Sequence, residues 1–136
     1  MEEKMNYVKL AVNGTLMRGL ELEGNMLNAG GVFEREDRTE KKYRLWSIHD
    51  NNPAMIRVTD GDENAVCVDV EIWKVPLAGL ASILLKEPAG LSIGKVRLYG
   101  GEEVLGVIAE PVLLIGMKEI SAYGGWRSYL SSKKQN

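Results

Sequence analysis

Apolar residues fall in short, β-branched runs along the chain, and glycine-containing segments separate these runs. Paired glycines occur at 30–31, 100–101 and 124–125, where a tight turn with positive φ suits a residue without a Cβ. Several short runs with turn signals between them predict a β-rich domain, with a small barrel as the expected closure. The expected strands are Tyr7–Val12, Tyr43–Ile48, Met55–Val58, Val66–Val75, Ile93–Tyr99 and Val104–Ala109.

The clearest strand lies between Ala65 and Val75, where apolar and other residues alternate. One face is formed by Val66, Val68, Val70 and Ile72, and the other by Cys67, Asp69, Glu71, Trp73 and Val75. Alternation with period two is the pattern of a strand whose two faces differ. The two carboxylates are ordinary if their face meets water, and they indicate chemistry if it lines a cavity.

Two helices are predicted by proline positions and helical spacing. Pro76 opens a helix at Leu77–Lys86, and Pro88 ends it. Pro111 opens a shorter helix through Met117. The segment 126–130 is too short to assign, and the polar tail 131–136 is expected to be solvated and mobile. We therefore expect one α+β domain over 1–136, with its core at about 6–130: a small mixed barrel flanked by short helices.

Composition and charge exclude several classes of protein. The chain has 136 residues, with 17 basic against 19 acidic side chains, for a formal net charge of −2. This charge gives no footprint for nucleic acid or an anionic membrane, and 136 residues suit one domain.

Cysteine and histidine content bears on redox and metal chemistry. With one cysteine, Cys67, and one histidine, His49, the chain forms no internal disulfide and completes no structural zinc set of these ligands; we expect no metal and no cofactor. The segment Met1–Met5 lacks the apolar stretch of a signal peptide, and no apolar run approaches the roughly 20 residues that cross a bilayer. We expect a cytosolic protein.

The loop Asn13-Gly14-Thr15-Leu16 directly follows the first expected strand. Its backbone N–H groups are placed to converge on a small anion where the chain leaves the sheet. The alternative is a structural turn, because Asn and Gly are turn residues. The glycine and lysine spacings of a P-loop and of a dinucleotide fingerprint are absent.

Three charged residues are candidates for chemistry or binding. Glu71 has a raised pKa if it is desolvated and unpaired, and the alternative is a solvent-facing or salt-bridged glutamate. Glu87, at a helix end, is either a solvated charge or a group projected over a pocket. Arg44 offers bidentate recognition of a carboxylate, or its stem covers Trp46 at the surface.

Other reactive residue types give weaker signals. His49 is the default general base near neutral pH, but its surroundings, Ile48-His49-Asp50-Asn51-Asn52-Pro53, read as a turn. Cys67 is expected to pack as a small apolar residue. Serine and threonine lack a nucleophile elbow. The residues alone therefore predict a fold better than a reaction.

The motifs taken in order along the chain form a family pattern. They are Gly14–Gly19, Thr39 with Tyr43-Arg44-Leu45, Val70–Leu77, Ile93-Gly94, Gly106 with Glu110-Pro111, and Ile120–Leu130. This order resembles the C-terminal domain of allophanate hydrolase from about Val8 to Leu130, and the last motif is the most specific. The loop at 12–19 is similar to the Tyr-Gly-Ser/Thr-Leu loop of the gamma-glutamylcyclotransferase-like fold.

The resemblance implies a small barrel with a pocket around the glycine-containing loop. It also implies site residues: a ligand loop at Asn13–Leu16, ligand contacts from Tyr43, Arg44, Trp126 and Arg127, and catalytic carboxyls at Glu71 and Glu87. In that family the domain decarboxylates N-carboxycarbamate, the product of the amidase domain, whose Ser-Ser-Lys machinery this sequence does not contain. The family histidine of a Leu-Asn-His stretch is also absent, because this chain reads Leu22-Glu23-Gly24.

Two functions follow as hypotheses. The first is an enzyme that acts on a small carboxylated or amide-bearing metabolite, by N-carboxycarbamate decarboxylation or gamma-glutamyl cyclotransfer, with Glu71 or Glu87 as proton donor. The second is a non-catalytic domain that binds a metabolite or docks on a separately encoded amidase. A homodimer through the aromatic C-terminal segment is a further expectation.

Overall fold

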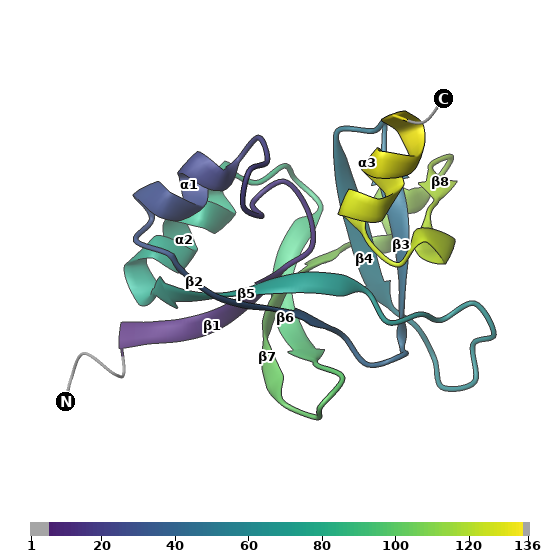
Figure 1. Ribbon diagram of the computed structural model, residues 1–136, viewed down its shortest axis with the longest axis horizontal. Helices are drawn as coiled ribbons and strands as arrows, with labels where there is room; N and C mark the ends of the chain where they lie inside the picture. The colour runs from purple at the N-terminus through teal and green to yellow at the C-terminus, as the bar shows by residue number, and fades with distance from the viewer. Residues whose placement is uncertain (1–5, 135–136) are drawn as a thin grey trace.

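A computed structural model describes residues 6–134 and shows two sheets with three short α-helices (Figure 1). Met1–Met5, which bears on the signal-peptide prediction, and Gln135–Asn136 at the end of the polar tail lie outside the described residues. The strands are β1 (Tyr7–Val12), β2 (Val32–Arg38), β3 (Tyr43–Ile48), β4 (Asn52–Arg57), β5 (Asp69–Pro76), β6 (Leu91–Arg97), β7 (Glu103–Ala109) and β8 (Lys118–Glu119). The helices are α1 (Glu23–Asn28), α2 (Leu77–Lys86) and α3 (Trp126–Lys134), with 3₁₀ turns η2 (Pro111–Leu114) and η3 (Ser121–Tyr123).

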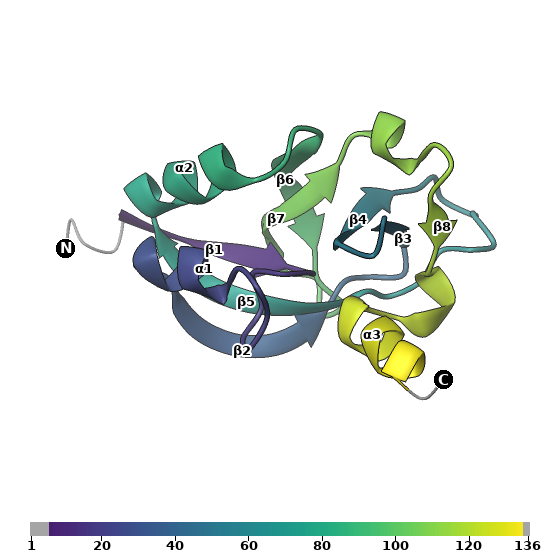
Figure 2. The same ribbon diagram turned by 90° about the horizontal axis from the view of Figure 1, so that it is seen from above.

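The five-stranded sheet has the order β2-β5-β1-β7-β6, and the three-stranded sheet has the order β4-β3-β8. β1 lies at the centre of the larger sheet, antiparallel to β5 and parallel to β7. Helices α1 and α2 lie together beside the larger sheet, while the smaller sheet and α3 gather at the other end of the molecule (Figures 1 and 2). The α+β class is confirmed, although over residues 6–134 the strands form two sheets and no closed barrel.

Both faces of β5 are buried, because β5 lies inside the sheet with packing on each side. Val70 and Ile72 pack with Ala11, Leu98 and Val104 in a small cluster. Trp73 and Val75 face the main core under α1 and α2, where Met26 and Ile83 are buried. The face that carries Glu71 therefore meets the core, and Glu71 is only 2% exposed.

Several strands and helices begin or end at residues other than those predicted. The predicted strand 66–75 begins at Asp69, the strand 55–58 begins at Asn52, and the predicted helix after Pro111 is the single turn η2. The polar residues 131–134, expected to be mobile, form the last turn of α3. The predicted helix Leu77–Lys86 is confirmed with the same bounds. None of the helices within residues 6–134 is long and apolar enough to cross a membrane.

A close contact between α1 and α2 gives the first testable prediction. A Cβ built on Gly79 of α2 would overlap the carbonyl group of Ala29, which follows α1. Backbone atoms yield little, so we expect Gly79→Ala to lower the free energy of unfolding by about 2 kcal/mol in urea denaturation. Gly24→Ala in α1 is the matched control, because a Cβ there meets nothing within 4 Å. Equal stability of the two variants would contradict this packing.

Candidate functional site

The loop after β1 is held in place at both ends. The Met17 amide donates to the Gly14 carbonyl at 3.0 Å, and the Leu22 amide donates to the Thr15 carbonyl at 2.9 Å. The buried Asn13 side chain donates through Nδ2 to the Val107 carbonyl at 3.0 Å. Among residues 6–134, no partner accepts a hydrogen bond from the amides at 14–16. The loop thus offers three successive backbone donors.

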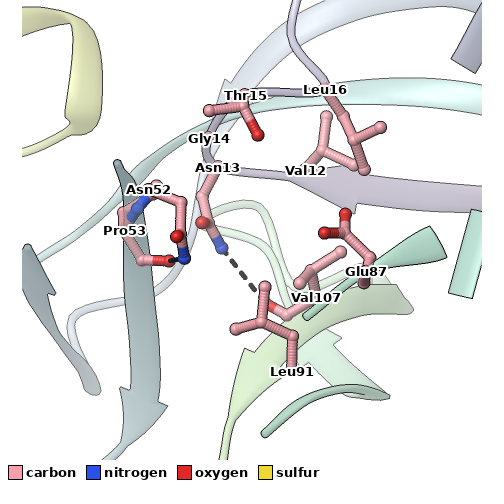
Figure 3. A pocket seen from close by; sticks show the side chains of 10 residues that line it. All are labelled: Val12, Asn13, Gly14, Thr15, Leu16, Asn52, Pro53, Glu87, Leu91 and Val107. Atoms are coloured by element: carbon pink, nitrogen blue, oxygen red, sulfur yellow. Dashed lines mark hydrogen bonds between the residues drawn. The ribbon is translucent and has the colours of Figure 1, made fainter. Parts of the chain in front are cut away.

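A small hollow lies beside this loop and has a volume of about 20 Å³. That volume accommodates about one water-sized group. Figure 3 shows the residues that surround it, from β1 and its loop, the start of β4, the end of α2, and β6 and β7. They are Val12, Asn13, Gly14, Thr15, Leu16, Asn52, Pro53, Glu87, Leu91 and Val107. The hollow is smaller than a whole metabolite and admits one terminal group.

Glu87 is the titratable residue of the hollow. It directly follows α2 and is half-buried, and its carboxyl group lies between the loop and Val107 (Figure 3). Burial raises the pKa of Glu87, and no charged neighbour contributes to this shift. A carboxylic acid with a raised pKa holds its proton to higher pH, and it then donates a hydrogen bond or the proton itself. Of the two alternatives predicted for Glu87, a solvated charge or a group over a pocket, the structure shows the second.

The second predicted catalytic residue, Glu71, is held as a charged carboxylate. Its oxygens accept hydrogen bonds from the Arg18 amide at 2.9 Å, from Arg18 Nε at 3.1 Å, from Arg127 Nη2 at 2.9 Å and from Trp73 Nε1 at 3.2 Å. Burial raises the pKa of Glu71, but these bonds outweigh burial and bring the pKa below its usual range. Of the two alternatives predicted for Glu71, the structure shows the salt-bridged one, and its lowered pKa does not favour the role of proton donor.

Arg127 supports the loop from outside the hollow. Its Nη2 donates to the Arg18 carbonyl at 2.6 Å as well as to Glu71. Together with Glu71 and Met17 it lines a separate cleft of about 230 Å³. Arg127 is not among the residues that line the hollow.

The other predicted ligand contacts are engaged elsewhere. Arg44 forms a bidentate pair with Glu119, with nitrogen–oxygen distances of 2.7 and 2.6 Å, and its guanidinium lies 5.0 Å from the centre of the Trp46 ring. Tyr43 is buried, and its hydroxyl accepts a hydrogen bond from the Arg97 amide at 3.3 Å. Trp126 is buried in the main core. None of the three predicted contacts lines the hollow.

The opposite wall of the hollow comes from residues that no local sequence pattern singles out. Asn52 and Pro53 begin β4, and a Cβ on Gly14 would lie 2.5 Å from Cδ of Pro53. The sequence pattern around the Asn-Pro pair predicts only a turn. Its contact with Gly14 joins the two sheets, and a local pattern does not show such a contact. His49 lies exposed in the turn before β4, in line with the loop reading.

Comparison with known proteins gives a family. The family model described as "Allophanate hydrolase C-terminal domain" matches residues 8–131. Urea amidolyase from Lachancea kluyveri is 30% identical over 134 residues, a match that covers 94% of this chain and 7% of that protein. The chain thus spans a small fraction of the curated relatives it matches.

Solved structures agree with this match. The uropathogenic Escherichia coli-specific protein c4763 is 58% identical with a TM-score of 0.88, and the match covers 92% of this chain and 96% of that chain. Allophanate hydrolase from Kluyveromyces lactis is 27% identical with a TM-score of 0.87, covering 97% of this chain and 22% of that chain. The predicted gamma-glutamylcyclotransferase-like fold is confirmed by the structural neighbours. The chain belongs to the allophanate hydrolase C-terminal domain family.

Proposed function

We propose that the domain binds a small metabolite with a terminal carboxylate or amide group at the hollow, and that Glu87 acts there as proton donor. The observation that carries this proposal is the position of Glu87, a half-buried acid whose pKa is raised by burial, beside a loop whose amides at 14–16 have no acceptor among residues 6–134. The amides supply hydrogen bonds to an anionic or carbonyl oxygen. A protonated carboxyl supplies the proton that a leaving nitrogen requires.

The reaction class follows from these two groups. In decarboxylation of an N-carboxylated amide, the carbon–nitrogen bond to the carboxylate breaks and its electron pair stays on nitrogen. Carbon dioxide leaves, nitrogen takes the proton of Glu87, and water returns a proton to Glu87. Apolar walls from Val12, Leu91 and Val107 surround the acid, and loss of water destabilises a carboxylate that is about to leave as a neutral gas. Gamma-glutamyl cyclotransfer is the related reaction for a substrate with an amide.

The size of the hollow limits the substrate. At about 20 Å³ it accepts one terminal group, so the rest of the substrate lies at its mouth. Small dicarboxylates and ureido acids fit this description better than large or aromatic metabolites.

A direct assay tests the proposal. Purified protein is incubated with an N-carboxylated amide and with gamma-glutamyl amines, and carbon dioxide, free amine and 5-oxoproline are measured. We expect turnover of one substrate class, and its loss in Glu87→Gln. Glu63→Gln, in an exposed loop, is the control and should retain turnover. Absence of turnover with both substrate classes contradicts the catalytic proposal.

A second candidate is an accessory domain that docks on a separate amidase. It is favoured by the missing family histidine at Leu22-Glu23-Gly24. A shift of several degrees in Tm with malonate, without turnover, would support metabolite binding alone. Co-purification with an amidase from the native host would support docking.

A further inference from the structure

The first turn of α3 is attached to the loop that forms one wall of the hollow. Arg127 donates to the Arg18 carbonyl and to Glu71, while Glu71 accepts from the Arg18 amide. Arg18 follows the loop 13–17 directly, so these bonds fix the position at which that loop ends. A helix residue, a buried strand residue and the loop are thereby joined.

The later turns of α3 are attached to the turn between β3 and β4. Asp50 in that turn accepts hydrogen bonds from the Tyr129 hydroxyl at 2.6 Å, from Ser47 Oγ at 2.6 Å and from Lys133 Nζ at 2.7 Å. These bonds, with Lys133 first, hold the pKa of Asp50 well below its usual range. His49 and Asp50 have φ values of 52° and 58°, a left-handed conformation that residues with a Cβ adopt at a cost. The contacts with α3 thus stabilise a strained turn.

The turn leads directly into the other wall of the hollow. Asn52 and Pro53 follow it at the start of β4, and Pro53 packs against Gly14 of the loop. The contacts therefore close into a ring that runs from the loop through Glu71 and Arg127 into α3, then through Asp50 to β4 and back to the loop. We call this set of contacts the α3 ring.

We infer that α3 sets the distance between the two walls of the hollow. Arg127, Tyr129 and Lys133 are then positioning residues for the group that enters beside Glu87. The relevance of this distance to a ligand rests on the proposed function. The distance itself is a property of the free protein. None of these three side chains lines the hollow, so each acts through the wall that it holds.

The pKa of Glu87 should depend on the distance between the two walls of the hollow. The residues that face it from the β1 loop, β4, β6 and β7 are Val12, Asn13, Gly14, Thr15, Leu16, Asn52, Pro53, Leu91 and Val107, and none of them titrates. Lys86, next to Glu87 in sequence, is exposed. Water is therefore the main variable: a wider gap admits water, and hydration favours the charged carboxylate. Loosening the α3 ring should lower the pKa of Glu87 toward 4.5, its ordinary value.

The test is a ¹³C NMR titration of the Glu87 carboxyl in the full chain, without ligand. Tyr129→Phe removes one hydroxyl and leaves the aromatic side chain packed against Trp126. Lys133→Met removes the exposed ammonium group that binds Asp50. We expect each change to lower the midpoint pH of Glu87 by about half a unit or more, with faster amide exchange at 14–16. Lys133→Arg keeps the charge and should restore the midpoint.

Glu102→Gln is the matched control. It breaks the Lys9–Glu102 ion pair, which lies outside the α3 ring, and should leave the midpoint unchanged. The inference is overturned if the midpoint pH of Glu87 is unchanged in both Tyr129→Phe and Lys133→Met. It is also overturned if Glu102→Gln shifts this midpoint by an equal amount. If wild type binds no carboxylate at all, the proposed function fails while this titration still decides the inference.

Discussion

Glu71→Ala is expected to lower the free energy of unfolding by about 3 kcal/mol at pH 7, because breaking a buried ion pair leaves its partners without compensation. The change removes the acceptor of the Trp73 indole, of the Arg18 amide and of two guanidinium groups. Arg18 and Arg127 are partly exposed and turn to water, which keeps the loss near the lower end of the range for buried pairs. Urea denaturation measures it.

The stability loss in Glu71→Ala should depend on pH, in the direction set by the lowered pKa of Glu71. The folded pKa of Glu71 lies below the ordinary value of 4.5, so its charged form stabilises the folded state above that value, and this contribution is lost as the pH falls through the folded pKa. The stability difference between wild type and Glu71→Ala should therefore shrink in acid. Glu102→Ala, which breaks exposed pairs, should cost about 0.5 kcal/mol. A Glu71→Ala effect no larger than that control would show that the buried cluster contributes little.

Glu87→Gln is expected to reduce turnover by about 100-fold or more, because a positioned acid typically contributes 10²–10⁴-fold. Glutamine keeps the shape and the hydrogen-bond donor but has no proton to give. Affinity for the substrate should change little, so the effect should fall on kcat rather than on KM. Steady-state kinetics on both proteins distinguishes the two parameters.

Stability of Glu87→Gln should also differ from wild type in a pH-dependent way. A group whose folded pKa is raised stabilises the folded state below its unfolded pKa, and that stability is lost as the pH rises through the folded value. Glu87→Gln lacks this titration. The free energy of unfolding of Glu87→Gln, taken relative to wild type, should therefore be higher at pH 8 than at pH 4. Parallel stability curves for the two proteins would show that Glu87 is solvated.

The sequence predicted most of the core strands and α2, and it failed where local pattern and environment diverge. β2 was missed because five of its seven residues are charged, although an edge strand tolerates such residues. The pattern placed Glu71 on one strand face with Asp69 and Trp73 and left open what that face meets; in the structure β5 lies inside the sheet and both of its faces are covered. Alternation reports which residues share a face; it does not report what that face meets.

The site was predicted in part for a related reason. The loop 13–16 and Glu87 were candidates both from the residues and from the resemblance, and the fold brings them together in one hollow. The wall from β4 was missed, since its contact with Gly14 joins residues about forty positions apart. Arg44 was expected to contact a ligand because of the resemblance and its bidentate geometry, while its actual partner, Glu119, lies 75 residues away in sequence and does not show in a local pattern. Ion pairs between residues that are distant in sequence thus determine which charged side chains are available to a ligand.

The proposed function requires that Glu87 keep its proton to a higher pH than an ordinary glutamate, beside a hollow that accepts a small carboxylate. Its most direct test is a ¹³C NMR titration of the Glu87 carboxyl with and without malonate. The proposal predicts a midpoint above 4.5 in the free protein and a further rise with malonate, because the protonated form donates to the bound carboxylate. A midpoint at or below that value, or one that malonate does not move, would contradict it.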